Sequence, residues 1–182
     1  SRGLGDVYKR QVENGGEEGG RDTEEGQIYM KLKIITTNPG KYAEYSAMLK
    51  QTNVELEHVE FAYPEIQADD LESVVRHALT NLSTTFQEPF LIEDSGLFID
   101  ALKGFPGVYS SYVFRCIGYE GILKLMQGVE QRDARFECCI GVYLHGYHVF
   151  KGTCNGMIAQ HARGKGGFGY DPVFIPAGEQ RT

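Results

Sequence analysis

Short apolar runs alternate with segments of helical periodicity along most of this chain, and this alternation constrains its fold more than any other feature. Phe90-Leu91-Ile92 predicts a buried strand, whereas the apolar residues between Val74 and Leu82 recur at the spacing of one helix face. Such alternation is typical of an α/β protein with a mixed sheet. We predict strands over 31–37, 54–61, 90–92, 97–101, 136–144, 148–158 and 173–175, and helices over 42–51, from Asp69 or Asp70 through Leu82, and over 121–126.

The first 29 residues differ in composition from the rest. Residues 1–27 hold 7 of the 23 glycines and a run of mixed charge, with few apolar side chains. Such a segment buries too little apolar surface to offset the entropy lost on ordering. We therefore expect residues 1–29 to be a disordered extension, non-native or upstream, and residues 30–182 to form one domain.

Charge and cysteine content exclude several classes of protein. A net charge of −7 disfavours general affinity for nucleic acid, although a few basic residues can still gather around a small phosphorylated ligand. No apolar run in the sequence reaches the length of a membrane span. The four cysteines form no Cys-x-x-Cys pair, so we interpret them as reduced thiols in a cytoplasmic protein.

A first candidate site lies where a predicted strand gives way to a helix. Backbone N–H groups at a helix start favour an anion, and a lysine there adds positive charge. Taken alone, an Asn-Pro-Gly segment fits an ordinary turn into a helix better than a binding site. The candidate residues are Thr36, Thr37, Asn38, Pro39, Gly40 and Lys41.

Carboxylates form a second candidate site. Glu93-Asp94-Ser95-Gly96 follows the buried strand, and open α/β sheets bind ligands beyond the carboxyl ends of their strands. Adjacent acids suit Mg²⁺, which prefers carboxylates and water. A solvated Asp-Ser-Gly turn is an equal alternative. Glu65, in a loop after Pro64, is a candidate second carboxylate, although an ordinary surface acid fits it better when it is considered alone.

A glycine-rich loop, Gly164–Pro172, is the third candidate. Its four glycines within six positions let the backbone pass close to a ligand. Aromatic side chains and an acid in such a loop favour stacking on a base and reading of its edge, over a loop whose aromatics fill a gap in the core. The candidate residues are Phe168, Gly169, Tyr170 and Asp171.

Five motifs together resemble the inosine triphosphate pyrophosphatase family, also described as XTP/dITP diphosphatases. They follow the order and the approximate spacing of that family and cover nearly all of residues 30–182. The motifs are Thr36-x-Asn38-x-x-Lys41-x-x-Glu44, Pro64-Glu65-Ile66-Gln67, Glu93-Asp94-Ser95-Gly96-Leu97, Gly104-Phe105-Pro106-Gly107-Val108-Tyr109-Ser110 and Gly166-Gly167-Phe168-Gly169-Tyr170-Asp171-Pro172.

The resemblance implies an elongated mixed β-sheet flanked by helices, with two lobes around a central cleft, in a homodimer. It also implies Mg²⁺-dependent hydrolysis of ITP, dITP or XTP to the nucleoside monophosphate and pyrophosphate. In this family's pattern, Thr36, Asn38 and Lys41 hold the triphosphate. Glu65 and Asp94 hold the metal ion, and Asp94 also activates the attacking water.

For the base, the resemblance implies stacking on Phe168 and reading of its edge by Asp171, with Ser95 as a further contact. The family pattern continues with a lysine-bearing segment and a Ser-His-Arg motif, and this chain ends at Arg181-Thr182 before them. We therefore expect a pyrophosphatase domain that lacks its C-terminal segment. The alternative is a nucleotide-binding module with little or no turnover.

Overall fold

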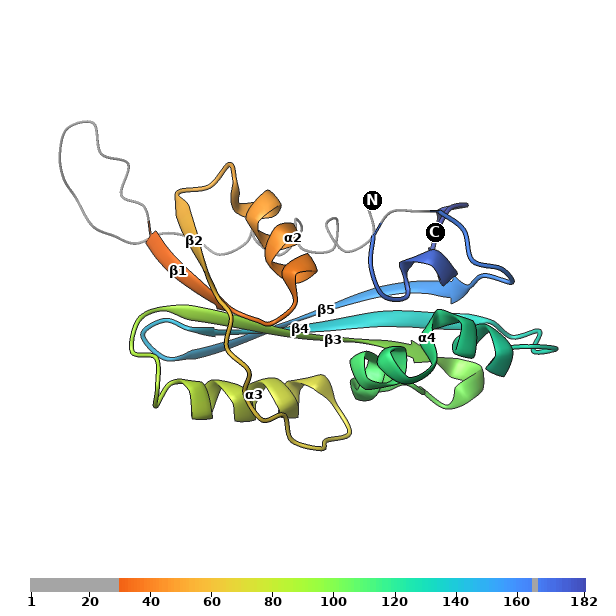
Figure 1. Cartoon of the computed structure of the whole chain (residues 1–182), viewed down its shortest axis with the longest axis horizontal. Coiled ribbons are helices and arrows are strands. Elements are labelled where there is room, and N and C mark those ends of the chain that lie inside the picture. Colours follow the sequence, from red (N-terminus) through yellow and green to blue (C-terminus); the bar gives the residue numbers. More distant parts are fainter. Residues whose placement is uncertain (1–29, 165–166) are drawn as a thin grey trace.

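The computed structural model of the chain describes residues 30–164 and 167–182 (Figure 1). The predicted extension over residues 1–29 lies outside the described residues, as do Lys165 and Gly166 of the glycine-rich loop. One sheet has the strand order β2-β1-β3-β4-β5-β6. Its strands are β1 (Met30–Ile35), β2 (Val54–Val59), β3 (Phe90–Ile99), β4 (Asp133–Tyr143), β5 (Tyr147–Ile158) and β6 (Phe174–Pro176).

The sheet is mixed, as the sequence predicts. β1 pairs in parallel with β2 and β3, whereas β3, β4, β5 and β6 are paired antiparallel. The long strands β3, β4 and β5 run side by side along the elongated molecule (Figure 1). The helices are α2 (Pro39–Leu49), α3 (Leu71–Leu82) and α4 (Ser110–Leu125), with short 3₁₀ turns η1 (Asp100–Leu102), η2 (Gly107–Tyr109) and η3 (Asp171–Val173). None of the helices in the described part of the chain has the length and apolar character that crossing a bilayer requires.

Helix α3 forms because its apolar residues share one face. Asp70, rather than Asp69, caps the helix, since its Oδ1 accepts the N–H of Ser73 at 2.9 Å. Six residues of the helix are buried, and five of them belong to one apolar cluster with Phe90 and Ile92 of β3. The alternation of side chains along a strand turns Leu91 to the opposite face. There it packs with Tyr45 of α2, so both faces of β3 are covered.

Strand β3 is longer than the sequence predicts. It continues through the four residues Glu93–Gly96 and pairs with β4 from Phe90, opposite Tyr143, to Ile99, opposite Ala134. The alternative of a solvated turn is therefore wrong, as is the predicted break between strands 90–92 and 97–101, because the ladder with β4 satisfies the backbone of polar residues as well as apolar ones. Asp94 and Ser95 are therefore held in extended backbone.

Strand β1 accompanies β3 for only a short distance. The pairing consists of Lys33 with Phe90 and Ile34 with Leu91, after which the chain turns into α2. The second half of β3 lies instead against η2 and α4. Val113 and Ile122 of α4 pack in one cluster with Leu97 of β3. The two halves of β3 therefore have different neighbours, and the boundary between the halves lies at Glu93 and Asp94.

Helix α4 also begins earlier than predicted, at Ser110 rather than at residue 121. Its backbone is interrupted at Gly118, where φ is 61°, so the segment is two shorter helices joined at a kink. The interruption breaks the periodicity of the apolar residues, and this explains why the sequence pattern revealed only the second part.

Candidate active site

The first turn of α2 is built by its own polar side chains. Asn38 caps the helix: its Oδ1 accepts the N–H of Gly40 at 2.9 Å and that of Lys41 at 3.4 Å. The N–H of Asn38 in turn donates to Thr36 Oγ1 at 3.1 Å. Pro39 occupies the first helical position, where its missing N–H costs nothing. The ordinary-turn interpretation is therefore correct as far as local structure goes, and this turn sets Lys41 toward β3.

Lys41 joins the helix start to the central strand. Its Nζ lies 3.0 Å from Glu93 Oε2 and also donates to the Glu93 carbonyl oxygen at 3.0 Å. The side chains of Lys41 and Glu93 are only 16% and 6% exposed. Burial alone lowers the pKa of Lys41, but the negative charges of Glu93 and Asp94 outweigh it and raise that pKa above its usual value. Lys41 therefore stays charged.

Glu93 is a functional candidate to which the sequence reasoning gave no role of its own. Besides Lys41, its carboxylate accepts a contact from the Cys138 thiol, with 3.3 Å between Sγ and Oε1. The signal available in the sequence was its place in an alternating strand, which turns Glu93 and Asp94 to opposite faces. Two adjacent acids in a strand can therefore have different partners.

The pKa of the Asp94 carboxyl group lies well above its ordinary value. Burial raises its pKa to about 7; Lys41 opposes this shift, whereas Glu65 and Glu93 add to it. The N–H of Ser95 donates to Asp94 Oδ1 at 2.9 Å and orients the group. A pKa near neutrality is the value at which a carboxylate exchanges protons most effectively.

Tyr63 lies beside these charges, in the loop that leads from β2 to α3. It is half-buried against the cluster that contains α3. Burial raises the pKa of its phenol, Lys41 opposes this and Glu65 adds to it, so the hydroxyl stays protonated. Glu65 itself is exposed on the same loop. The structure thus brings Glu65 into electrostatic range of Asp94, from a segment distant in the sequence.

The glycine-rich loop folds back onto the start of α2. A Cβ atom built on Gly40 would lie 3.1 Å from Phe168 Cδ1, so the phenyl ring rests against the backbone of Gly40. The Phe168 ring remains 39% exposed. The backbone N–H of Phe168 donates to Asp171 Oδ2 at 2.9 Å. Burial raises the pKa of Asp171, and this hydrogen bond opposes the shift. The first and third candidate segments are therefore neighbours.

Other predicted residues occupy different environments. Thr37 is exposed directly before the cap, and Ser95 is half-buried on β3. Tyr170 departs from its predicted place, because its side chain is 4% exposed and its hydroxyl donates to the Ser110 carbonyl oxygen at 3.0 Å. The Tyr170 side chain faces the core rather than a ligand.

No metal cage is preformed in the described residues: no three His, Cys, Asp or Glu side chains converge on one point there. The pair Glu65 and Asp94 nevertheless fits an ion that takes one or two protein carboxylates and completes its shell with water and phosphate oxygens. After burial, the negative charge of Glu65 also raises the pKa of Asp94, so the two carboxylates repel each other and a cation between them would relieve that repulsion.

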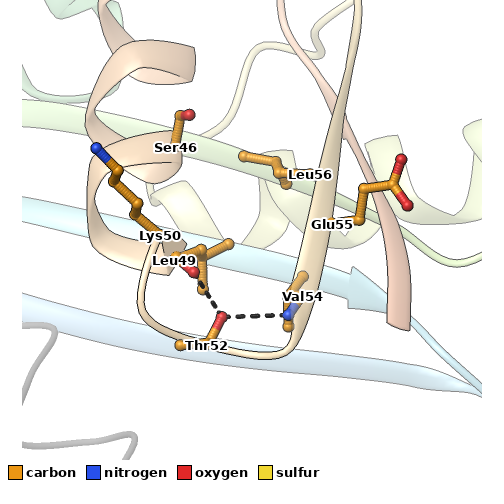
Figure 2. Close-up of a pocket in the computed structure, with 7 residues that line it drawn as sticks. All are labelled: Ser46, Leu49, Lys50, Thr52, Val54, Glu55 and Leu56. Carbon is orange, nitrogen blue, oxygen red and sulfur yellow. Dashed lines mark hydrogen bonds between the residues drawn. The ribbon is translucent and has the colours of Figure 1, made fainter. Parts of the chain in front are cut away.

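The hollow in Figure 2 is separate from this group. It lies at the C-terminal end of α2 and the start of β2, away from the capped first turn. Thr52 closes it by donating to the Leu49 carbonyl oxygen at 2.7 Å and accepting the Val54 N–H at 3.3 Å. Its lining includes none of the predicted site residues; it consists of Ser46, Leu49, Lys50, Thr52, Val54, Glu55 and Leu56.

The fold and these side chains define a mixed α/β protein that gathers a buried lysine, carboxylates and a phenyl ring where β1 leaves the central strand. Its family is clear from comparison with known proteins. The chain belongs to the Ham1 family, whose model matches residues 32–182.

Curated relatives and solved structures agree with this assignment. The chain is 53% identical over 154 residues to the dITP/XTP pyrophosphatase of Pyrococcus horikoshii, covering 84% of this chain and 83% of that protein. It is 46% identical over 155 residues to the dITP/XTP pyrophosphatase of Methanopyrus kandleri, covering 84% and 82%. The HAM1 protein of Coxiella burnetii has a similar structure, with a TM-score of 0.71 and 28% identity over 84% of this chain and 85% of that one.

Proposed function

We propose that this chain hydrolyses the non-canonical purine nucleoside triphosphates ITP, dITP and XTP to the nucleoside monophosphate and pyrophosphate. The observation that carries the proposal is the meeting of three segments at the start of α2. Lys41 is ion-paired to β3 beside Asp94, and Phe168 rests on Gly40 one residue away. Charge for phosphates and a ring for a base are therefore adjacent. The names of the relatives give the same substrate class.

The triphosphate binds at the capped turn in this proposal. The N-terminus of α2 supplies partial positive charge, and Lys41 supplies a full charge that burial has not removed. Thr36, Thr37 and Asn38, together with the backbone of Pro39 and Gly40, contribute further polar groups. Ser95 lies beside Asp94 on β3 and contacts the substrate from the strand.

The base lies against the exposed face of Phe168. Stacking provides affinity whatever the base carries at its edge. Asp171 lies three residues further on and supplies an acceptor for that edge, while Gly169 lets the backbone pass closely between them. The position of the ring on α2 fixes the distance from the base to the phosphate site.

Asp94 is the group that we assign to catalysis. Hydrolysis of the bond between the α- and β-phosphates requires a water molecule to lose a proton as it attacks. In this proposal the Asp94 carboxylate accepts that proton, and the N–H of Ser95, which donates to Asp94 Oδ1 at 2.9 Å, orients it. Glu65 and Asp94 are the residues that would hold Mg²⁺. When bound there, Mg²⁺ offsets the charge of the phosphate oxygens.

Three broader expectations belong to the same proposal. We propose a homodimer on the resemblance alone, and sedimentation measurements test it. A cytoplasmic location is supported by the four cysteines, which form no disulfide with one another in the described residues. Within this chain we assign the proposed activity to residues 30–182, the pyrophosphatase domain without the C-terminal segment of the family pattern, and we expect residues 1–29 to be dispensable.

The test is release of pyrophosphate from ITP, XTP and ATP by the purified full chain, with and without Mg²⁺. We expect turnover of ITP and XTP well above that of ATP, and loss of turnover in Asp94→Asn by at least about 10²-fold. Asp100→Asn is the matched control, because the same change falls just beyond the far end of β3, on a carboxylate that pairs with Arg135.

Two results would count against the proposal. Near-normal hydrolysis of ITP by Asp94→Asn removes the catalytic assignment. Binding of ITP by the wild-type chain with no pyrophosphate released supports a nucleotide-binding module instead.

A further inference from the structure

Tyr170 is an aromatic residue of the glycine-rich loop that the proposed function does not use. Its ring lies edge-on to Phe114 of α4, with centroids 5.2 Å apart and planes at 84°. Its hydroxyl donates to the Ser110 carbonyl oxygen at 3.0 Å. Burial raises the pKa of this phenol to about 12, so the hydroxyl is protonated and able to donate at neutral pH.

Ser110 connects this contact to the central strand. Tyrosine and cysteine apart, Ser110 is the only polar or charged residue that is buried in residues 30–164 and 167–182. Its Oγ accepts the N–H of Leu97 at 2.8 Å and donates to the Gly107 carbonyl oxygen at 2.6 Å. Leu97 lies two residues beyond Ser95 on β3. A chain of buried hydrogen bonds therefore runs from Tyr170 through residue 110 to the strand that carries Asp94.

The backbone of Phe168 is bonded within the loop to Asp171, which accepts the Phe168 N–H on its carboxylate and donates its own N–H to the Phe168 carbonyl oxygen at 3.3 Å. Gly167 and Gly169 flank Phe168 with φ of 79° and 62°, a region that glycine enters freely. The ring itself contacts Gly40 but is partly exposed. Among its neighbours in the loop, the fixed point is Tyr170, which the core holds by both its ring and its hydroxyl.

We propose that Tyr170 is a positioning residue: its buried hydrogen bond to Ser110 holds Phe168 against the first turn of α2 and keeps the base platform in register with the carboxylates of β3. The inference rests on the proposed function for its catalytic consequence, but not for its structural one. With the bond in place, the loop is ordered before the substrate arrives, and binding does not have to supply that ordering.

The first experiment separates binding from turnover. Tyr170→Phe removes one hydroxyl and keeps the ring against Phe114. We expect KM for ITP to rise about two- to tenfold, the effect of one lost hydrogen bond, with kcat within about twofold of wild type. Tyr112→Phe is the matched control, because Tyr112 lies on α4, the helix of Phe114, and is 62% exposed. This substitution should leave both KM and kcat unchanged. An unchanged KM, or a fall in kcat without a change in KM, overturns the proposal.

The second experiment does not depend on activity. The chain contains no tryptophan, so Phe168→Trp introduces a single tryptophan, whose emission can be excited separately from that of the tyrosines. Adding Tyr170→Phe should shift its emission to the red and increase acrylamide quenching, whereas adding Tyr112→Phe should change neither. Unchanged emission and quenching in the Tyr170→Phe variant overturn the positioning role. Failure of the wild-type chain to hydrolyse ITP would refute the proposed function and leave this result standing.

Discussion

At Asp94 the folded chain holds a carboxylate where charge is disfavoured. Burial disfavours the charged form of this carboxylate most strongly, and the negative charges of Glu65 and Glu93 add to the effect. Lys41 favours the charged form, and the result is a pKa of about 7 in place of 3.8. An acid with a raised pKa binds its proton more tightly when folded than when unfolded. Its contribution to stability is therefore greatest below the unfolded pKa and declines as pH rises toward the folded one.

We therefore predict that Asp94→Asn stabilises the metal-free chain at neutral and higher pH. Asparagine does not titrate, so the difference in free energy of unfolding should grow between about pH 4 and pH 7 and then level off at roughly 1–4 kcal/mol. Urea denaturation in EDTA at several pH values measures it, with Asp69→Asn at an exposed position as the control. A constant difference across this window would show that Asp94 is not perturbed.

Phe168 allows a separate prediction about affinity and selectivity. Phe168→Ala removes the stacking ring and should weaken the binding of ITP by roughly 1–3 kcal/mol, which raises KM. A π-face does not distinguish a 6-keto from a 6-amino group, so the ratio of kcat/KM for ITP to that for ATP should stay within about threefold. Steady-state kinetics on both nucleotides decides this. Collapse of the ratio would mean that the ring, and not polar groups such as Asp171, reads the base.

Local sequence patterns predicted some of the candidate site residues but not the contacts between distant segments. Asn38 and Lys41 stand at a strand-to-helix junction, where the chemistry of helix starts is local and known. The ion pair of Lys41 with Glu93 joins residues 52 positions apart, and no local pattern indicates it. The burial of Tyr170 was equally hidden, because its partners Phe114 and Ser110 lie on a helix start that the periodicity did not reveal.

At the scale of elements, β3 organises the molecule, and its close packing depends on a glycine. A Cβ atom on Gly96 would lie 2.4 Å from the Gly107 carbonyl oxygen, a contact with backbone that cannot rotate away. Gly96→Ala should therefore force β3 and η2 apart and lengthen the bond from Leu97 to Ser110. We predict a loss of roughly 1–3 kcal/mol in free energy of unfolding, the usual effect of overpacking.

Urea denaturation of Gly96→Ala tests this prediction, with Thr153→Ala on exposed β5 as the control that should be nearly neutral. Wild-type stability in Gly96→Ala would show that the backbone of η2 yields without loss. A drop in the control of the same size would instead point to a general sensitivity of the sheet.

Elements with strict periodicity were predicted well, and those whose limits depend on distant partners were not. The α3 pattern gave the helix because its six buried residues share one face. The sequence predicts two strands, 90–92 and 97–101, since polar residues lie between them, but pairing with β4 makes one continuous strand from Phe90 to Ile99. Hydrogen bonds to a neighbouring strand do not depend on side-chain polarity, and this is why composition misplaced the boundary.

At the scale of the whole molecule, the described residues form a core of three apolar clusters arranged along the sheet. One lies between α3 and β3, one between β1 and α2, and one joins α4 to β6 and the glycine-rich loop. Their buried residues extend from Leu32 to Phe174. The clusters are thus contributed by the part of the chain in which strands and helices alternate.

The last prediction follows from this distribution. Deleting residues 1–27 should leave the Tm within about 2 °C of the full chain, because a charged, glycine-rich segment offers no apolar periodicity to anchor it. The deletion keeps Ile28-Tyr29, so the N–H of Met30 remains a peptide donor to the Asn53 carbonyl oxygen. Removing residues 1–33 is the positive control: it deletes most of β1 and the buried Leu32, and it should lower the Tm by many degrees. If the shorter deletion also lowered the Tm that far, residues 1–27 would have to pack on the domain, and the assignment of the whole fold to residues 30–182 would be wrong.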